Sequence, residues 1–120
     1  MSGRVPSRYV IIELTSIDGG VNNIIKTSIE NEVKSAIYIN YGEYGAAMIG
    51  QLIKVYDAVP LTSNKAIVVL KVPASHCKEC ITSMEVSFKG VKIGGGPGRT
   101  VPVKLEWLDT VGSIDNVMLI

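Results

Sequence analysis

The segment 76–80 holds the residues of this sequence that come closest to a metal or redox site. Cys77 and Cys80 have C-x-x-C spacing and directly follow His76. Two thiolates at this spacing beside an imidazole can bind zinc, and a dithiol at the start of a helix can be activated for redox chemistry. The sequence has no second cysteine pair and no other histidine to complete a four-ligand site. Both sulfurs also fall on the apolar side of an expected helix, which favours core cysteines over ligands.

A glycine-rich stretch, residues 94–100, is the second candidate for chemistry, because glycine-rich loops can hold phosphate groups. It reads Gly-Gly-Gly-Pro-Gly-Arg-Thr. A phosphate-binding loop opens a helix, whereas an expected strand follows here. We therefore interpret residues 89–100 as a flexible loop. Lys89, Lys92 and Arg99 make it a candidate contact for RNA phosphates.

Catalytic patterns are missing from the rest of the sequence. It contains no nucleophile motif, and no acidic pair lies near His76 in a spacing typical of acid–base catalysis. The chain is therefore not expected to be an enzyme by itself. No apolar run approaches the ~18 residues that cross a bilayer, and the first residues lack the apolar run of a signal peptide. We expect a cytoplasmic protein without membrane contact.

The charge is unevenly distributed, although the net charge is only +1. Residues 54–104 hold eight basic and three acidic residues, a local charge of +5, and the residues after Lys104 include three acidic residues and no basic ones, a local charge of −3. A basic middle segment is compatible with RNA binding, because phosphate contacts need a local patch rather than a basic whole chain. Scattered, solvated lysines on a neutral domain would give the same counts.

Hydrophobic patterning predicts the elements that must position these residues. Apolar residues at helical spacing predict two helices, and β-branched apolar runs predict four strands. The helices are expected over residues 22–40 and 75–88, and the strands over residues 8–14, 46–57, 65–72 and 101–108. Pro102 cannot donate to a sheet ladder, which predicts a position at the sheet edge for the last strand.

The predicted order is βαββαβ, with the first and third strands central because both are apolar on alternate faces. This order is typical of the α+β, ferredoxin-like and RNA-recognition-like sandwich, an antiparallel sheet with two helices on one face. At 120 residues the chain fits one domain, residues 1–120.

The sheet face opposite the helices is expected to contact a partner. RNA-recognition domains place aromatic rings on the first and third strands to stack bases, and here Tyr9 is the only aromatic residue in those strands. We therefore expect RNA contact through phosphates rather than base capture. An apolar sheet face is costly to leave in water, so Tyr9, Ile11, Ile67 and Val69 are predicted to form a protein interface.

Three segments carry a resemblance to a known family. They are Ser7–Leu14 (SRYVIIEL), Tyr41–Ala47 (YGEYGAA) and Leu108–Ile114 (LDTVGSI). In this order and spacing they resemble the small, RNA-recognition-like protein subunit of archaeal and eukaryotic ribonuclease P. The 120-residue length is similar to that of archaeal members, the protein component 2 type.

The resemblance implies a role and partners. Ribonuclease P removes the 5′ leader from precursor tRNA, its chemistry belongs to its RNA, and in eukaryotes this subunit is shared with ribonuclease MRP. The resemblance implies pairing with ribonuclease P RNA and with a barrel-shaped protein subunit, assembly as a dimer of such heterodimers, and a lower magnesium requirement of the RNA. It implies no cofactor on this chain.

The basic middle segment, with Arg8 added from the first motif, supplies the candidate RNA-binding residues. They are Arg8, Lys54, Lys65, Lys71, Lys89, Lys92, Arg99 and Lys104. The alternative to an RNA-bound subunit is a freestanding ferredoxin-like regulatory or metal-binding domain. Stoichiometric zinc or copper without RNA in the natural complex would identify that alternative.

Overall fold

A computed structural model describes residues 6–16, 26–93 and 99–112 of the chain. Its helices are α1 (Lys26–Ile49) and α2 (Cys77–Ser87), with short 3-10 turns η2 (Gly50–Leu52) and η3 (Ala74–His76). Its strands are β1 (Ser7–Thr15), β2 (Lys54–Pro60), β3 (Lys65–Pro73), β4 (Gly90–Ile93), β5 (Arg99–Pro102) and β6 (Lys104–Val111).

Four strands form one antiparallel sheet in the order β2-β3-β1-β6. The central position of β1 and β3 confirms the prediction from their apolar patterns. Along β1 the burial alternates, with Val10, Ile12 and Leu14 fully buried between partly exposed neighbours. Side chains alternate across a strand, so these three residues mark the face that carries the core.

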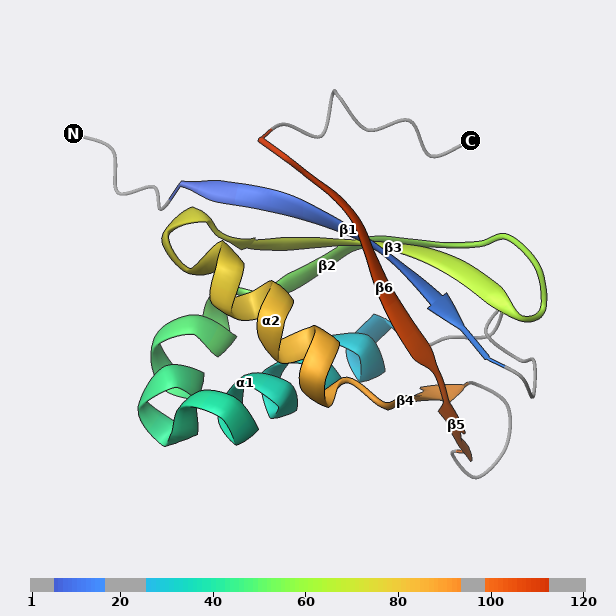
Figure 1. The fold of residues 1–120 in the computed structure, drawn as a ribbon, viewed down its shortest axis with the longest axis horizontal. Coiled ribbons are helices and arrows are strands. Elements are labelled where there is room, and N and C mark those ends of the chain that lie inside the picture. The colour runs from blue at the N-terminus through green and yellow to red at the C-terminus, as the bar shows by residue number, and fades with distance from the viewer. Residues whose placement is uncertain (1–5, 17–25, 94–98, 113–120) are drawn as a thin grey trace.

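Both helices cover that face of the sheet, as Figure 1 shows. The core between the layers combines β1 and β3 with one stripe of each helix, including Ile29 and Val33 of α1 and Cys80 and Met84 of α2. The predicted α+β, ferredoxin-like sandwich is therefore confirmed. That residues 1–120 form a single domain stays a prediction.

The region 40–57 differs from its prediction. The helix expected over residues 22–40 continues to Ile49, and the strand expected over residues 46–57 begins only at Lys54. The glycines of this region do not end the helix but produce a kink, because Gly42 alone leaves helical geometry, at φ 73° and ψ −169°. After the kink, Gly45 and Ile49 are buried at i and i+4, so residues 46–49 form a helical turn against the core.

The region after α2 also differs. The segment expected as a flexible loop, residues 89–100, contains β4 and the start of β5, which pair with Lys92 opposite Thr100. Val91 and Val101 are buried, which anchors this hairpin to the core. The expected strand 101–108 is divided between β5 and β6, so Pro102 lies in the hairpin and not in the sheet. β6 is nonetheless an edge strand, as predicted.

The helix expected over residues 75–88 is shorter. Residues 74–76 form the 3-10 turn η3, and α2 begins at Cys77. The peptide N–H of Ala74 donates to Pro6 O at 2.8 Å, which holds this tight turn to the start of β1.

A bulge in β2 shapes the open face, the name used here for the sheet face opposite the helices. The register between β2 and β3 shifts between Val55 and Asp57 and skips Tyr56. Two contacts from α1 hold the bulge: the Val55 N–H donates to Glu30 Oε1 at 2.8 Å, and Lys26 Nζ lies 3.7 Å from Asp57 Oδ1. Bulges of this kind redirect a side chain, here Tyr56.

Candidate RNA and protein-contact surfaces

The predicted RNA-binding residues whose side chains the structure describes do not form one continuous patch. Lys54 and Lys71 lie directly opposite each other in the β2–β3 ladder, and Tyr9 is the partner of Lys71 on the other side. Both lysines are exposed. The structure therefore brings two cations together at one end of the open face.

A second pair of cations lies at the other end of the same face. Lys65 and Lys104 flank Thr15, one from β3 and one from β6. The acidic residues Glu13 and Glu106 are paired in the β1–β6 ladder near them. Like charges directly opposite each other destabilise a sheet. The open face thus has basic ends and an acidic strip beside β6.

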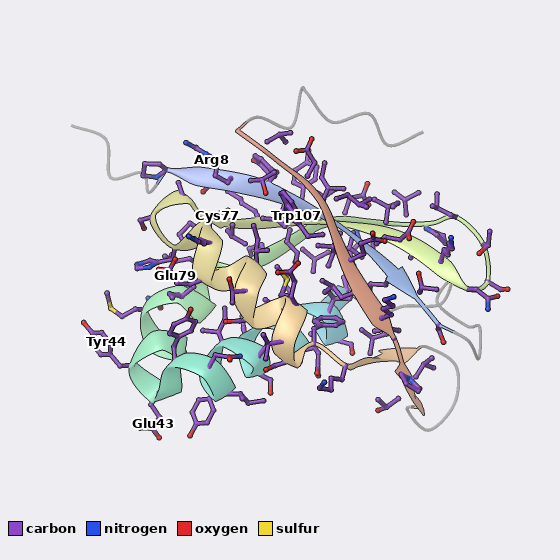
Figure 2. The ribbon with its side chains drawn as sticks, in the orientation of Figure 1. Arg8, Glu43, Tyr44, Cys77, Glu79 and Trp107 are labelled. Atoms are coloured by element: carbon purple, nitrogen blue, oxygen red, sulfur yellow. The ribbon has the colours of Figure 1, made fainter. Side chains whose placement is uncertain are left out.

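The remaining cations lie away from the open face. Lys89 is exposed just after α2, and its carbonyl oxygen accepts the Val103 N–H at 2.9 Å. Lys92 and Arg99 lie in the β4–β5 hairpin, and their side chains fall outside the described part of the structure. Arg8 is exposed near the start of β1, close enough to Cys77 to act on its thiol electrostatically (Figure 2).

The predicted protein interface lies on the open face but exposes little apolar surface. Tyr9, Ile11 and Ile67 are partly buried there. Val69 lies between Ile11 and Asp57 in the ladder and is 0% exposed, so its side chain offers no surface to a partner. Whether these residues contact a protein stays a prediction.

Exposed apolar side chains gather instead on the second half of α1. We define the α1 apolar surface by its exposed residues Tyr38, Ile39, Tyr41, Tyr44 and Met48. Tyr44 is 78% exposed, and Figure 2 shows it pointing outward beside Glu43. Residues 35–53 contain a single charged residue, Glu43, so this surface lacks the cations that a phosphate backbone needs.

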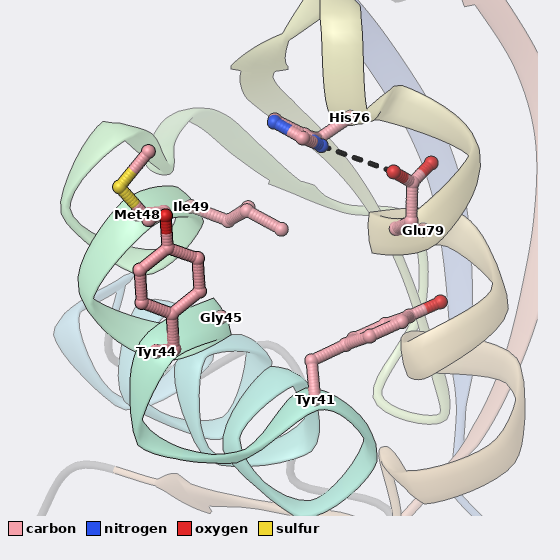
Figure 3. Close-up of a pocket in the computed structure, with 7 residues that line it drawn as sticks. All are labelled: Tyr41, Tyr44, Gly45, Met48, Ile49, His76 and Glu79. Carbon is pink, nitrogen blue, oxygen red and sulfur yellow. Dashed lines mark hydrogen bonds and ion pairs between the residues drawn. The ribbon is translucent and has the colours of Figure 1, made fainter.

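A groove of about 320 Å³ runs between this surface and α2. Figure 3 shows Tyr41, Tyr44 and Met48 on the α1 side, with His76 and Glu79 on the opposite wall. His76 Nδ1 lies 3.0 Å from Glu79 Oε2, and this hydrogen bond is the main reason why the pKa of Glu79 is lowered. The groove is apolar along α1 and ends in a polar pair.

The sequence contains a signal for this surface in the spacing of its tyrosines. Tyr38, Tyr41 and Tyr44 recur every three residues, as on one side of a helix. The glycines at 42 and 45 predicted a helix end, which assigned the last two tyrosines to a turn. Their helical spacing becomes apparent only because α1 extends to Ile49.

The two cysteines are partly or fully enclosed by the core. Cys80 is 0% exposed, and burial is the main cause that raises its pKa to about 12. Burial also raises the pKa of Cys77, against a smaller opposing effect of Arg8. Metal ligation and nucleophilic attack both need the thiolate, so these environments disfavour either role. Within the described ranges, no three His, Cys, Asp or Glu side chains are grouped so that they could hold a metal ion.

Thiol reactivity provides a test of this assignment. At pH 8.5 an unfolded cysteine is about half ionised, so Cys80 in the folded chain should react with iodoacetamide ~10³-fold more slowly than after unfolding. The native state holds the Cys80 proton more tightly than the unfolded state does. Stability should therefore fall as the pH rises from the ordinary thiol pKa of ~8.5 towards 12.

Mass spectrometry of the native and the urea-unfolded chain measures both sites separately. Cys80→Ala serves as the control that leaves only the Cys77 signal, at a stability cost of about 1–3 kcal/mol for removing a buried group. Rapid native labelling of Cys80 would contradict the core assignment.

Comparison with known proteins adds one finding to this geometry. A model of the family described as Rpp14/Pop5 matches residues 8–118. No curated protein matches the chain significantly. Among the described residues, neither helix has the length and apolar character that spanning a membrane requires.

Proposed function

Because this chain belongs to the Rpp14/Pop5 family of ribonuclease P protein subunits, we propose that it is a non-catalytic subunit that assists the catalytic RNA in removing the 5′ leader from precursor tRNA. The family match over residues 8–118 is the observation that carries the proposal. The fold supports it, since a βαββαβ sandwich is a common architecture of RNA-associated domains, and no described helix covers the second face of the sheet.

The described cations support a positioning role toward RNA. Lys54 with Lys71, and Lys65 with Lys104, place ammonium groups at both ends of the open face. Ammonium groups attract phosphates without reading bases. We propose that these lysines, with Arg8, Lys89 and the hairpin residues Lys92 and Arg99, bring RNA strands together and lower the magnesium that the RNA needs. Magnesium itself would remain with the RNA, and this chain would hold no cofactor.

The α1 apolar surface is the better candidate for the protein partner. Tyr44 and Met48 are exposed beside a groove, whereas Val69 of the open face is fully buried. Interface cores are depleted of charged residues and enriched in Tyr and Met, which the composition of residues 38–48 matches. We propose that the barrel-shaped ribonuclease P subunit covers this surface, and that two such pairs can assemble in the cytoplasmic holoenzyme.

Reconstitution tests the functional proposal. Ribonuclease P RNA with its protein subunits should cleave precursor tRNA at lower magnesium when this chain is present than when it is omitted. Replacing Lys89, Lys92 and Arg99 together with Ala should lower the slope of log affinity against log salt, by roughly 0.7–0.9 for each phosphate that the variant no longer binds. An unchanged slope would remove the hairpin from the RNA surface.

The control for this experiment is a triple lysine-to-arginine exchange at Lys54, Lys65 and Lys71, which keeps the charge and should keep the slope.

Purification at native levels provides the decisive comparison. A natural complex that contains stoichiometric zinc or copper and no RNA would overturn the proposal in favour of a metal-binding domain.

A further inference from the structure

Two tyrosine rings meet on the open face across β3. Tyr9 belongs to β1 and Tyr56 to β2, and β3 lies between these strands. Their ring centroids are 5.5 Å apart at an interplanar angle of 80°, an edge-to-face pair. The Tyr56 side chain is 49% exposed. Tyr56 is the residue that the β2–β3 register skips, and this bulge places its ring on the open face. The pair therefore presents aromatic surface to solvent, and contacts from α1 hold the segment of β2 that carries Tyr56.

Two lysines lie beside these rings in the same corner. Lys71 is the ladder partner of both Tyr9 and Lys54, so all three residues form one row across the sheet. The row holds no acidic residue within the described strands, because Val111 completes it in β6. Like charges directly opposite each other repel, and an anion between Lys54 and Lys71 would relieve this repulsion.

A hollow of about 260 Å³ adjoins the row. Its lining includes Lys54, Lys71, Gln51 and Ser7. This volume is smaller than the ~300–1,000 Å³ of sites that enclose a whole small molecule. It suits one part of a larger ligand, such as a phosphate with its sugar, while the rest of the ligand lies on the exposed ring.

We propose that this corner, formed by Tyr9, Tyr56, Lys54 and Lys71, binds an unpaired nucleotide of RNA. The base stacks on the Tyr56 ring, whose position the edge-to-face contact with Tyr9 fixes, and the lysines contact the adjoining phosphates. Stacking requires a free base face, so the site selects single strands over duplexes. It reads little sequence, because every base offers a π-face.

The same observations favour RNA over a protein at this corner. Two cations without an acidic neighbour in their row would be costly to bury under a protein surface, but they attract a phosphate backbone. Asp57, the nearest acidic residue along β2, is paired with Lys26 of α1. The inference rests on the proposed RNA-associated function, and it adds Tyr56 of β2 to Tyr9, the only aromatic residue of the first and third strands of the sequence analysis.

Binding of a short, unstructured oligouridylate to the full chain tests the proposal. Tyr56→Ala should weaken this binding about 5- to 150-fold, the range that corresponds to the ~1–3 kcal/mol of one stacked base. It should leave binding of the same strand in a duplex unchanged. Tyr56→Phe keeps the ring and should bind like the parent chain. Lys54→Gln and Lys71→Gln should each lower the salt slope by about 0.7.

Val86→Ala is the control, because Val86 is an exposed apolar side chain on α2, outside the open face and the α1 apolar surface. It should leave oligouridylate affinity unchanged. Equal weakening of single strand and duplex by Tyr56→Ala, or no weakening, would overturn the stacking site. Loss of protein-partner binding with intact oligouridylate binding would assign the corner to a protein instead. Magnesium dependence in the reconstituted enzyme is measured separately, so the proposed function can survive the loss of this site.

Discussion

Joint replacement of Tyr44 and Met48 with Ala is expected to weaken binding of the protein partner at least about 30-fold. Buried interface anchors of this type contribute ~2 kcal/mol or more when truncated, and ~1.4 kcal/mol corresponds to a factor of ten. Both side chains are exposed in the chain alone, at 78% and 49%, so their removal should not unfold it. Titration calorimetry against the purified barrel-shaped ribonuclease P subunit, the partner proposed above, gives the affinity.

Self-association provides a second measurement of the same surface. The chain without its proposed partner should associate in sedimentation experiments, because no other described part of the chain covers the α1 apolar surface. The double variant should associate less. Leu61→Ala is the control, since Leu61 is an exposed apolar side chain in the turn between β2 and β3. Partner affinity that is unchanged in the double variant but reduced in Leu61→Ala would move the interface to that turn.

Replacement of Gly42 with Ala is expected to destabilise the fold by about 1–3 kcal/mol. At φ 73° and ψ −169° the backbone occupies a region that is essentially restricted to glycine. Beyond its chain neighbours and the surrounding helix backbone, no atom lies within 4 Å of an added Cβ, so the cost comes from the local backbone conformation and not from tertiary packing. Replacement of Gly45 with Ala should destabilise the fold by a similar amount for a different reason. Its added Cβ would clash with the Cβ of the Tyr41 side chain.

Urea unfolding measures these differences, and Gly112→Ala is the matched control. A Cβ at Gly112 would also meet open space, but the Gly112 backbone lacks the positive φ of Gly42. The control should therefore unfold like the parent chain. Partner affinity should also fall in Gly42→Ala, since the kink orients Tyr44. Equal stability of Gly42→Ala and Gly112→Ala would show that the kink is not required.

The sheet could be predicted from the sequence because its central strands carry their own signal. Val10, Ile12 and Leu14 alternate with less buried residues, and β3 is apolar along most of its length. Strands that are apolar on both faces fit only the centre of a sheet, so the central position of β1 and β3 could be predicted. The end of α1 could not be predicted in the same way. Gly42 breaks helical geometry at one residue, whereas the burial of Ile49 against the core decides that the helix resumes.

The candidate sites combine residues that lie far apart in the sequence, so they could be predicted only in part. Charge alone identifies the lysines, but their division between two ends of the sheet follows from strand register. Tyr56 was overlooked as the neighbour of Tyr9 because only the first and third strands were considered. Its place depends on a bulge held by Glu30, which lies 25 residues away in sequence from Val55.

The central position of β1 has a consequence for synthesis on the ribosome. Its second neighbour, β6, begins 89 residues after β1 ends at Thr15. Ribosomes add about 5–20 residues per second, so one edge of β1 remains unpaired for on the order of ten seconds before β6 is synthesised. During that interval the run from Tyr9 to Ile12 is a template for pairing with other nascent chains. Arg8 and Glu13 border this run, and charges in such positions oppose aggregation. Arg8 and Glu13 would thus oppose aggregation before the chain has folded.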